Sequence, residues 1–247
     1  MLKENGFKFG WLVCWLTSCH TVSTPAIQFT IYEINPTGDT TDEKQRQLHQ
    51  IYRRKEEDLN RVIAFSPRAV WQRAEEPVLS NWVADAVLDG VEKKTGMRPD
   101  MVLIPGWIMG KYLPKGNVAI RDIHQLIRGN YRWEIRRVSA LAVTRYLDSF
   151  LTVPYGGISA GTLIKREKEQ ITEIWLQHQK LLPSTEISLL TIQASETNRK
   201  KVFFLTAFPV IQMGYNLHEL VIGYCRSNTR AGFSVKMPEE KRRMEND

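Results

Sequence analysis

The sequence is poor in three features that would point directly to a function. It has only five histidines in 247 residues, and none is paired at the spacing of metal ligands, which argues against a metal centre built from them. Its N-terminal apolar stretch, residues 9–16, is too short to span a bilayer. Its formal net charge of +7 comes from basic residues spread along the chain. That spread favours a solvated surface over a nucleic-acid site, although an anionic ligand or an anionic membrane surface is compatible with it.

The N-terminus has the pattern of an export signal. Lys3 and Lys8 place positive charge ahead of the apolar stretch, and Leu16-Thr17-Ser18-Cys19 follows it. This ending resembles the lipobox of bacterial lipoproteins. The resemblance implies that residues 1–18 are a signal peptide and that Cys19 carries lipid. It also implies an exported lipoprotein anchored on the periplasmic side of a membrane, such as the outer membrane, or at the cell surface. The alternative is an ordinary secretory signal that happens to contain cysteines.

The stretch from Arg73 to Gly90 predicts a helix at the centre of the fold. Pro77 suits the first helical turn, where its missing N–H costs nothing, and Glu75 and Glu76 favour the positive end of the helix dipole. Asn81 and Asp85 lie one turn apart on the flank of the apolar stripe. The stripe that we expect to face the core consists of Leu79, Trp82, Val83, Ala86 and Val87.

The remaining pattern predicts a single mixed-sheet α/β domain over residues 41–236, after a tether at 19–40 and before a polar tail at 237–247 that we expect to fray. With 43% hydrophobic residues the chain has enough apolar surface for one such domain. We expect a long helix from Thr41 with a buried stripe in which Lys55 is the one polar interruption. The stripe consists of Leu48, Ile51, Tyr52, Lys55, Leu59, Val62 and Ile63. Gly96 suits a helix C-cap. Later helices are expected at 122–127, 139–151 and 216–224, and strands at 27–31, 101–104, 118–120, 131–136, 171–176, 187–192 and 201–207. The unbroken apolar run 101–104 predicts a strand covered on both faces. The alternation of apolar and charged residues over 131–136 predicts a half-buried strand with its charges toward solvent.

The central helix is similar to the helix that opens the C-terminal domain of the 5′-nucleotidases. The matching residues are Arg73, Glu76, Ser80-Asn81 and Ala84-Asp85-Ala86. Further counterparts of that family's loops follow in the same order along the chain. They are the turn from Pro105 to Gly110, Asp122-Ile123, Ile127 to Asn130, Tyr155-Gly156-Gly157, Phe208 and Met213-Gly214-Tyr215. The resemblance implies the mixed-sheet fold of that domain. In the family, this domain binds the nucleoside while a separate metallophosphatase domain holds two metals.

The same resemblance locates a candidate substrate site, in which Arg73 retains a family arginine and Phe208 a base-stacking ring. Trp107 and Tyr215 could rebuild the stacking site, or could simply pack beside the glycines next to them. Four family ligand positions are substituted here. Pro105 stands in place of an Asn, Gly110 in place of an Arg, Arg128 near a Phe, and Gln212 or Met213 near an Asp.

Four residues at the edge of this site have a structural interpretation. Arg73 either binds ligand or pairs with Glu76 or Asp85 at the helix entry. Asn81 and Asp85 either contact substrate or, as we favour, tie down neighbouring backbone, and Gly106 shapes the turn beside them.

We therefore predict a lipid-anchored, nucleotide- or nucleoside-binding specificity domain of a 5′-nucleotidase, a hydrolase of nucleotide catabolism. No catalytic residue and no metal or other cofactor is expected in this chain, and divalent metals are expected on a partner metallophosphatase chain. The alternative is a non-catalytic surface or periplasmic lipoprotein whose nucleoside pocket has been lost or turned to another ligand.

Overall fold

The computed structural model describes residues 43–73, 76–151, 156–168, 170–193, 205, 207–214 and 216–246. The lipobox with Cys19, the tether at 19–40, the strand expected at 27–31, Glu75, Tyr155 and Tyr215 lie outside the described residues, as do most residues of the strand expected at 201–207. None of the described helices is long and apolar enough to cross a bilayer.

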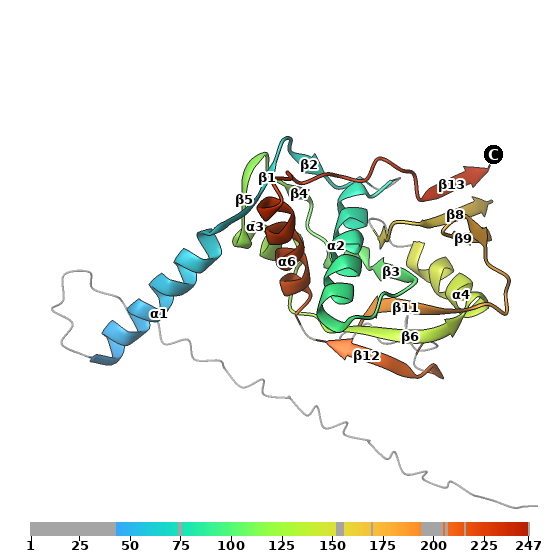
Figure 1. The fold of residues 1–247 in the computed structure, drawn as a ribbon, viewed down its shortest axis with the longest axis horizontal. Helices are drawn as coiled ribbons and strands as arrows, with labels where there is room; N and C mark the ends of the chain where they lie inside the picture. The colour runs from blue at the N-terminus through green and yellow to red at the C-terminus, as the bar shows by residue number, and fades with distance from the viewer. Residues whose placement is uncertain are drawn as a thin grey trace, which may run out of the picture.

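A mixed five-stranded sheet forms the centre of the molecule (Figure 1). Its order is β12-β6-β11-β3-β7. β11 runs parallel to β3 and antiparallel to β6, while β12 is antiparallel to β6 and β7 to β3. The strands are β3 (Met101–Ile104), β6 (Trp133–Ser139), β7 (Gly157–Ile158), β11 (Glu186–Ile192) and β12 (Val210–Gly214). The mixed α/β fold predicted from the sequence is confirmed.

Helices and a second sheet cover the two faces of the central sheet. All four residues of β3 are buried; Val102 and Ile104 pack in one apolar cluster, and Met101 and Leu103 in another. This alternation confirms the expected strand with both faces covered. The first cluster holds α2 (Val78–Thr95), α3 (Ile120–Leu126) and α6 (Leu217–Arg230), and the second holds α4 (Ala140–Leu151) with β8 (Thr162–Glu167) and β9 (Gln170–Leu176).

The central helix, α2, is buried along the predicted stripe. Leu79, Val83, Ala86 and Val87 are 0% exposed and Trp82 is 2% exposed. Gly96 ends the helix in the left-handed conformation with φ 73°, as expected for a C-cap. Close packing extends to the polar side of the helix, because a Cβ on Gly157 of β7 would lie 2.2 Å from the Ser80 carbonyl oxygen.

The remaining strands form three small sheets. β1 (Val62–Ser66) pairs with β5 (Gly116–Ala119), and β2 (Val70–Trp71) with β4 (Tyr112–Leu113). The third sheet has the order β10-β9-β8-β13, with β10 at Gln179–Lys180 and β13 at Arg243–Asn246. The expectation that the polar tail frays is wrong, because β13 pairs in parallel with β8 and Arg242 is only 1% exposed.

The first helix, α1 (Glu43–Asn60), forms where predicted but does not join the core. Residues 45–60 are all exposed, and α1 extends away from the body, with α3 as its main contact (Figure 1). The buried stripe expected on this helix is therefore wrong, and Ile63, which is 3% exposed, lies in β1 after the helix has ended. The exposed residues of that stripe are Leu48 at 52%, Ile51 at 50%, Tyr52 at 67%, Leu59 at 39% and Val62 at 51%.

Candidate functional site

The strand directions bring several loops to one edge of the central sheet. Trp133 at the start of β6 lies opposite both Ile192 at the end of β11 and Gly214 at the end of β12. Because β3 is parallel to β11, the turn after β3 leaves from the same edge. This turn contains a short 3-10 helix, η1 (Gly106–Ile108). We call this region the β3 edge, and it comprises η1, the segment before β6 and the end of β12.

Two aromatic rings meet at the β3 edge. Trp107 of η1 and Tyr131, two residues before β6, are both half-buried against the first apolar cluster. Their ring centroids lie 5.2 Å apart with the planes at 82°, an edge-to-face arrangement. Trp107 was predicted as a candidate stacking residue, whereas Tyr131 was expected only as part of a half-buried strand. The contact itself had no signal in the sequence, because it joins two separate loops.

The start of α2 lies beside the same turn. Gln72 donates its backbone N–H to the Lys111 carbonyl at 2.8 Å. Within the β3 edge, the backbone N–H of Arg128 donates to the Ile108 carbonyl at 2.7 Å. Arg73, which follows Gln72, is exposed, while Gly106 and Gly110 in the turn are buried. The residue before Arg73 is therefore bonded to the residue that follows this turn.

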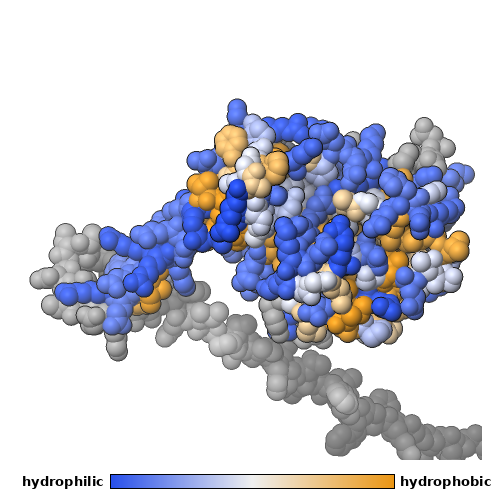
Figure 2. Space-filling model, viewed as in Figure 1, coloured by the Kyte–Doolittle hydropathy of each residue, from blue (hydrophilic) through white to orange (hydrophobic). Residues whose placement is uncertain are grey.

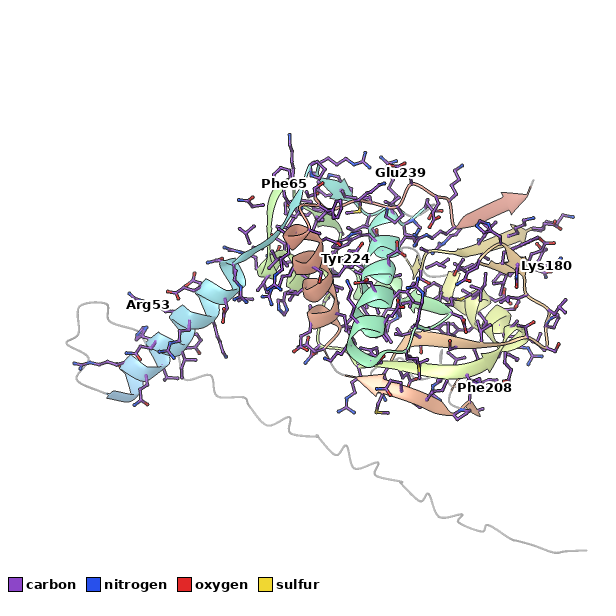
Figure 3. The ribbon with its side chains drawn as sticks, in the orientation of Figure 1. Arg53, Phe65, Lys180, Phe208, Tyr224 and Glu239 are labelled. Atoms are coloured by element: carbon purple, nitrogen blue, oxygen red, sulfur yellow. The ribbon has the colours of Figure 1, made fainter. Side chains whose placement is uncertain are left out.

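Phe208 lies apart from the β3 edge. It precedes β12, at the end of that strand opposite Gly214, and packs against the second apolar cluster (Figure 3). There Arg136 donates to the carbonyl oxygens of Phe208 and, at 3.1 Å, Leu205. Phe208 and Trp107 thus pack into clusters on opposite faces of the sheet.

The predicted half-buried strand that carries Arg136 is instead buried on both faces. Glu134 and Arg136 are each 8% exposed, and they form an ion pair at 2.8 Å within β6. Sequence alternation predicted these charges on a solvated face, but Tyr146 of α4 lies near Glu134, and Leu205 and Phe208 accept bonds from Arg136.

A polar group, which we call the Arg242 clamp, holds the flank of α2. It consists of the buried Asn81 and Arg242 and the half-buried Glu76 and Asp85. The Asn81 amide donates to Glu76, and its oxygen accepts the Ile158 N–H at 2.9 Å. Asp85 accepts the Ala160 N–H at 2.7 Å. Both side chains therefore fasten β7 and the residues after it to α2.

Arg242 completes this clamp from the far end of the sequence. Its guanidinium meets Asp85 through two bonds, at 2.8 and 2.9 Å, and also donates to the Asn81 carbonyl at 3.3 Å and to the Ile158 carbonyl. Burial raises the pKa of the Asp85 carboxyl, and the bonds from Arg242 and from Ala160 oppose that rise. The sequence contained one hint of this contact, the run Lys241-Arg242-Arg243, but we expected it to be solvated.

A cavity of about 570 Å³ lies elsewhere, between the turn that joins β1 to β2, α6 and residues 233–239. Tyr224 lines it together with Arg68, Phe233 and Lys236. Tyr224 stands on the side of α6 that meets α2, with its ring centroid 6.2 Å from that of Trp82 (Figure 3). Nothing in the sequence predicted this cavity.

The described residues do not fit a two-metal centre. Among them no group of three or more His, Cys, Asp or Glu side chains comes together to hold an ion. Two histidines do meet, since the rings of His124 on α3 and His218 on α6 stack at 4.2 Å. His218 Nε2 lies 2.8 Å from the Ile127 carbonyl oxygen. Burial lowers the pKa of His218 from its usual 6.5, and His124 adds to this effect.

Comparison with known proteins finds a likeness in fold. No family model and no curated protein matches the sequence. A 5′-nucleotidase precursor from Thermus thermophilus is similar with a TM-score of 0.63 and 13% identity, over 82% of this chain and 43% of that one. The sulfate thiohydrolase SoxB of Thermus thermophilus is similar with a TM-score of 0.60 and 11% identity, over 81% of this chain and 38% of that one. The NAD nucleotidase of Haemophilus influenzae is similar with a TM-score of 0.58 and 9% identity, over 83% of this chain and 42% of that one.

This chain therefore spans about two-fifths of the length of the solved structures that it matches. Its fold is that of the C-terminal domain of the 5′-nucleotidases, as the resemblance in sequence predicted. At these levels of identity the likeness concerns the fold and leaves activity and ligand to be argued from the site.

Proposed function

We propose that this chain is the substrate-recognition module of a 5′-nucleotidase-type system, and that it holds a nucleoside or nucleotide at the β3 edge. The observation that carries this proposal is the position of Trp107 and Tyr131. They meet where the loops of a nucleotidase-like domain converge. In open sheets with helices on both faces, ligands are commonly bound beyond the ends of the strands, where such loops gather.

The residues at the β3 edge suit the two parts of a nucleotide. An aromatic ring offers a flat π face for stacking a base, and the half-buried indole of Trp107 is the candidate for this role. Arg73 is exposed and follows Gln72, whose backbone N–H is bonded to the residue after the same turn. The fork of donors on an arginine matches the oxygens of a phosphate. We propose that Tyr215, which follows β12, contributes a further ring.

Hydrolysis would take place on a second molecule. The described residues supply no metal cluster, so the metals that activate water would be held by a metallophosphatase chain that docks on this domain. Purified metallophosphatase added to this chain should change the rate or the specificity of nucleotide hydrolysis. If it neither binds nor changes hydrolysis, this part of the proposal is wrong.

Calorimetric titration of the chain with AMP and with adenosine tests which ligand binds. We expect one site per chain, with affinity reduced at least tenfold by Trp107→Ala but unchanged by Trp175→Ala, since Trp175 lies on the second sheet. Arg73→Ala should weaken AMP more than adenosine because only AMP carries phosphate, and Arg98→Ala is the matched control. Absence of binding by both ligands would reject the nucleoside site.

One observation favours the alternative, in which the nucleoside pocket has been lost or turned to another ligand. A Cβ at Gly110 would lie 2.4 Å from the Gln125 carbonyl oxygen, so this turn has no room for the arginine that the resemblance places there. If AMP and adenosine both fail to bind, we propose that the domain is a non-catalytic lipoprotein with another ligand.

We further propose that the chain is exported and anchored through lipid on Cys19. The support is the sequence Leu16-Thr17-Ser18-Cys19 after a short apolar stretch. When bacterial cells that express the chain are grown with radioactive palmitate, the chain should become labelled. Cys19→Ser should abolish the label. Equal labelling of both forms would contradict lipidation at this residue.

A further inference from the structure

The apolar stripe of α1 is the largest mismatch between sequence and environment in the described residues. Leu48, Ile51, Tyr52 and Leu59 recur on one side of the helix and are between 39% and 67% exposed. The exposed apolar surface continues onto the body at Val62 and Phe65 of β1, which are 51% and 49% exposed. In Figure 2 the visible face of α1 is mostly hydrophilic, with hydrophobic residues along its edge and where it joins the body. A helix gains most of its stability from packing such a face, and among the described residues nothing covers that face of α1.

The charges of α1 are arranged in two adjacent blocks. Arg53, Arg54 and Lys55 form a basic block, and Glu56, Glu57 and Asp58 form an acidic block directly after it. Asp58 of the acidic block lies 3.8 Å from Arg61, and both side chains of this pair are more than half exposed. Figure 3 shows Arg53 on α1, away from the body of the molecule.

We propose that the α1 stripe binds the α1 stripe of a second copy of this chain in antiparallel orientation. If the two helices cross between residues 55 and 56, Tyr52 of each copy lies opposite Leu59 of the other. Lys55 then lies beside Glu56 of the second copy, and Arg54 beside Asp58. A parallel pair would instead place each block next to the same block, and like charges repel.

The antiparallel pair also covers the apolar surface at the base of α1. Because the helices run in opposite directions, the Leu48 end of one copy reaches the junction near Val62 of the other. A twofold axis makes the two contacts identical, as expected for a closed dimer. The contact between two helices of 18 residues is small, so we expect dissociation in the micromolar range.

The composition of α1 argues against an anionic membrane surface as its occupant. The helix carries five basic side chains against four acidic ones, whereas helices that lie on anionic lipid have an excess of Lys and Arg on the polar face. The acidic block at residues 56–58 would face the lipid headgroups unfavourably. A second copy, in contrast, offers Lys55 to Glu56 and Arg54 to Asp58.

Exchange of the charged blocks provides the test. One variant carries Arg53→Glu, Arg54→Glu and Lys55→Glu, and the other carries Glu56→Lys, Glu57→Lys and Asp58→Lys, each in the full chain with Cys19→Ser to prevent lipidation. We expect the unaltered helix to dimerise in sedimentation experiments as concentration rises, and each variant alone to lose at least tenfold in affinity. A mixture of the two variants should recover it by forming the mixed dimer.

Apolar substitutions test the stripe independently of charge. Ile51→Asp with Leu59→Asp should leave the chain monomeric at concentrations where Gln50→Asp, on the opposite side of α1, still dimerises. Near-ultraviolet circular dichroism should be unchanged in all variants, because α1 adds little to the packing of the body.

Three results would overturn the proposal. One is a monomer at all concentrations. Another is association with the same affinity in the charge-reversed variants, which is the result expected if the copies contact through the apolar N-terminal stretch. The last is a monomer that binds vesicles of anionic phospholipid through α1.

Discussion

α1 and α2 have the same length, 18 residues, and their apolar residues recur at the same spacing, yet they differ in environment. Trp82 of α2 is 2% exposed, whereas Tyr52 of α1 is 67% exposed. Periodicity therefore identifies which side of a helix is apolar without showing that the same chain covers it. One cue did separate the two helices, because Lys55 interrupts the stripe of α1 while the stripe of α2 contains no charge.

The first prediction concerns the apolar stripes themselves. Trp82→Ala removes a fully packed indole and should lower the free energy of unfolding by about 3–5 kcal/mol. Tyr52→Ala, the matched change on α1, should alter it by less than about 0.5 kcal/mol in the monomer. Urea unfolding at a protein concentration too low for self-association measures both. Equal effects would mean that α1 is as well packed as α2.

The second prediction concerns the polar flank of α2, for which α1 has no counterpart among the described residues. Asp85→Ala leaves the 1% exposed guanidinium of Arg242 with Glu240, at 2.8 Å, as its remaining acidic partner. We expect Asp85→Ala to lower the free energy of unfolding by about 2–3 kcal/mol. Glu92→Ala breaks the exposed pair with Arg98 and should cost under about 1 kcal/mol. A similar small loss for Asp85→Ala would show that the Arg242 clamp adds little.

The third prediction concerns the end of α2. Gly96 has φ 73° with open space around its Cα, so Gly96→Ala should cost about 1–2 kcal/mol through backbone strain alone. Gly223→Ala in α6, where there is also open space but helical backbone, should instead stabilise by about 0.5–1 kcal/mol. Thermal unfolding of the two variants distinguishes conformation from packing, and a loss at both sites would contradict this explanation.

The smallest effect on stability is expected where α3 contacts α6. α3 also supports the base of α1. Because burial lowers the pKa of His218 from 6.5, the unfolded chain binds a proton at this residue more readily than the folded one. The contribution of His218 to stability should therefore be complete above about pH 6.5 and decline as pH falls toward the lowered pKa. His218→Gln should remove this part of the pH dependence, measured as the difference in Tm between pH 8 and pH 5. An unchanged difference would exclude His218 as its source.

The sequence predicted the elements that depend on local signals. Pro77, the stripe of α2 and Gly96 mark one helix from end to end, and the apolar run 101–104 identifies a strand covered on both faces. The resemblance added the order of the loops along the chain and the fold.

The parts that sequence did not predict depend on contacts between distant segments. The position of Phe208 follows from the pairing of β12 with β6, and Tyr131 meets Trp107 only because β6 starts where β3 ends. Burial of Glu134 depends in the same way on the segments that cover it. Charged residues such as Arg242 look solvated in sequence until the fold supplies a partner.

The Arg242 clamp has a consequence for the time course of folding. Arg242 follows its partner Asp85 by 157 positions, so a growing chain exposes the carboxylate long before the ribosome has produced the cation that neutralises it. Until then α2 and β7 are joined only by the bonds that Asn81 and Asp85 accept, without those of Arg242. We therefore expect the body to close late and in a single cooperative step. If the chain is exported as proposed, this delay would keep it open to the secretion machinery while it is being made.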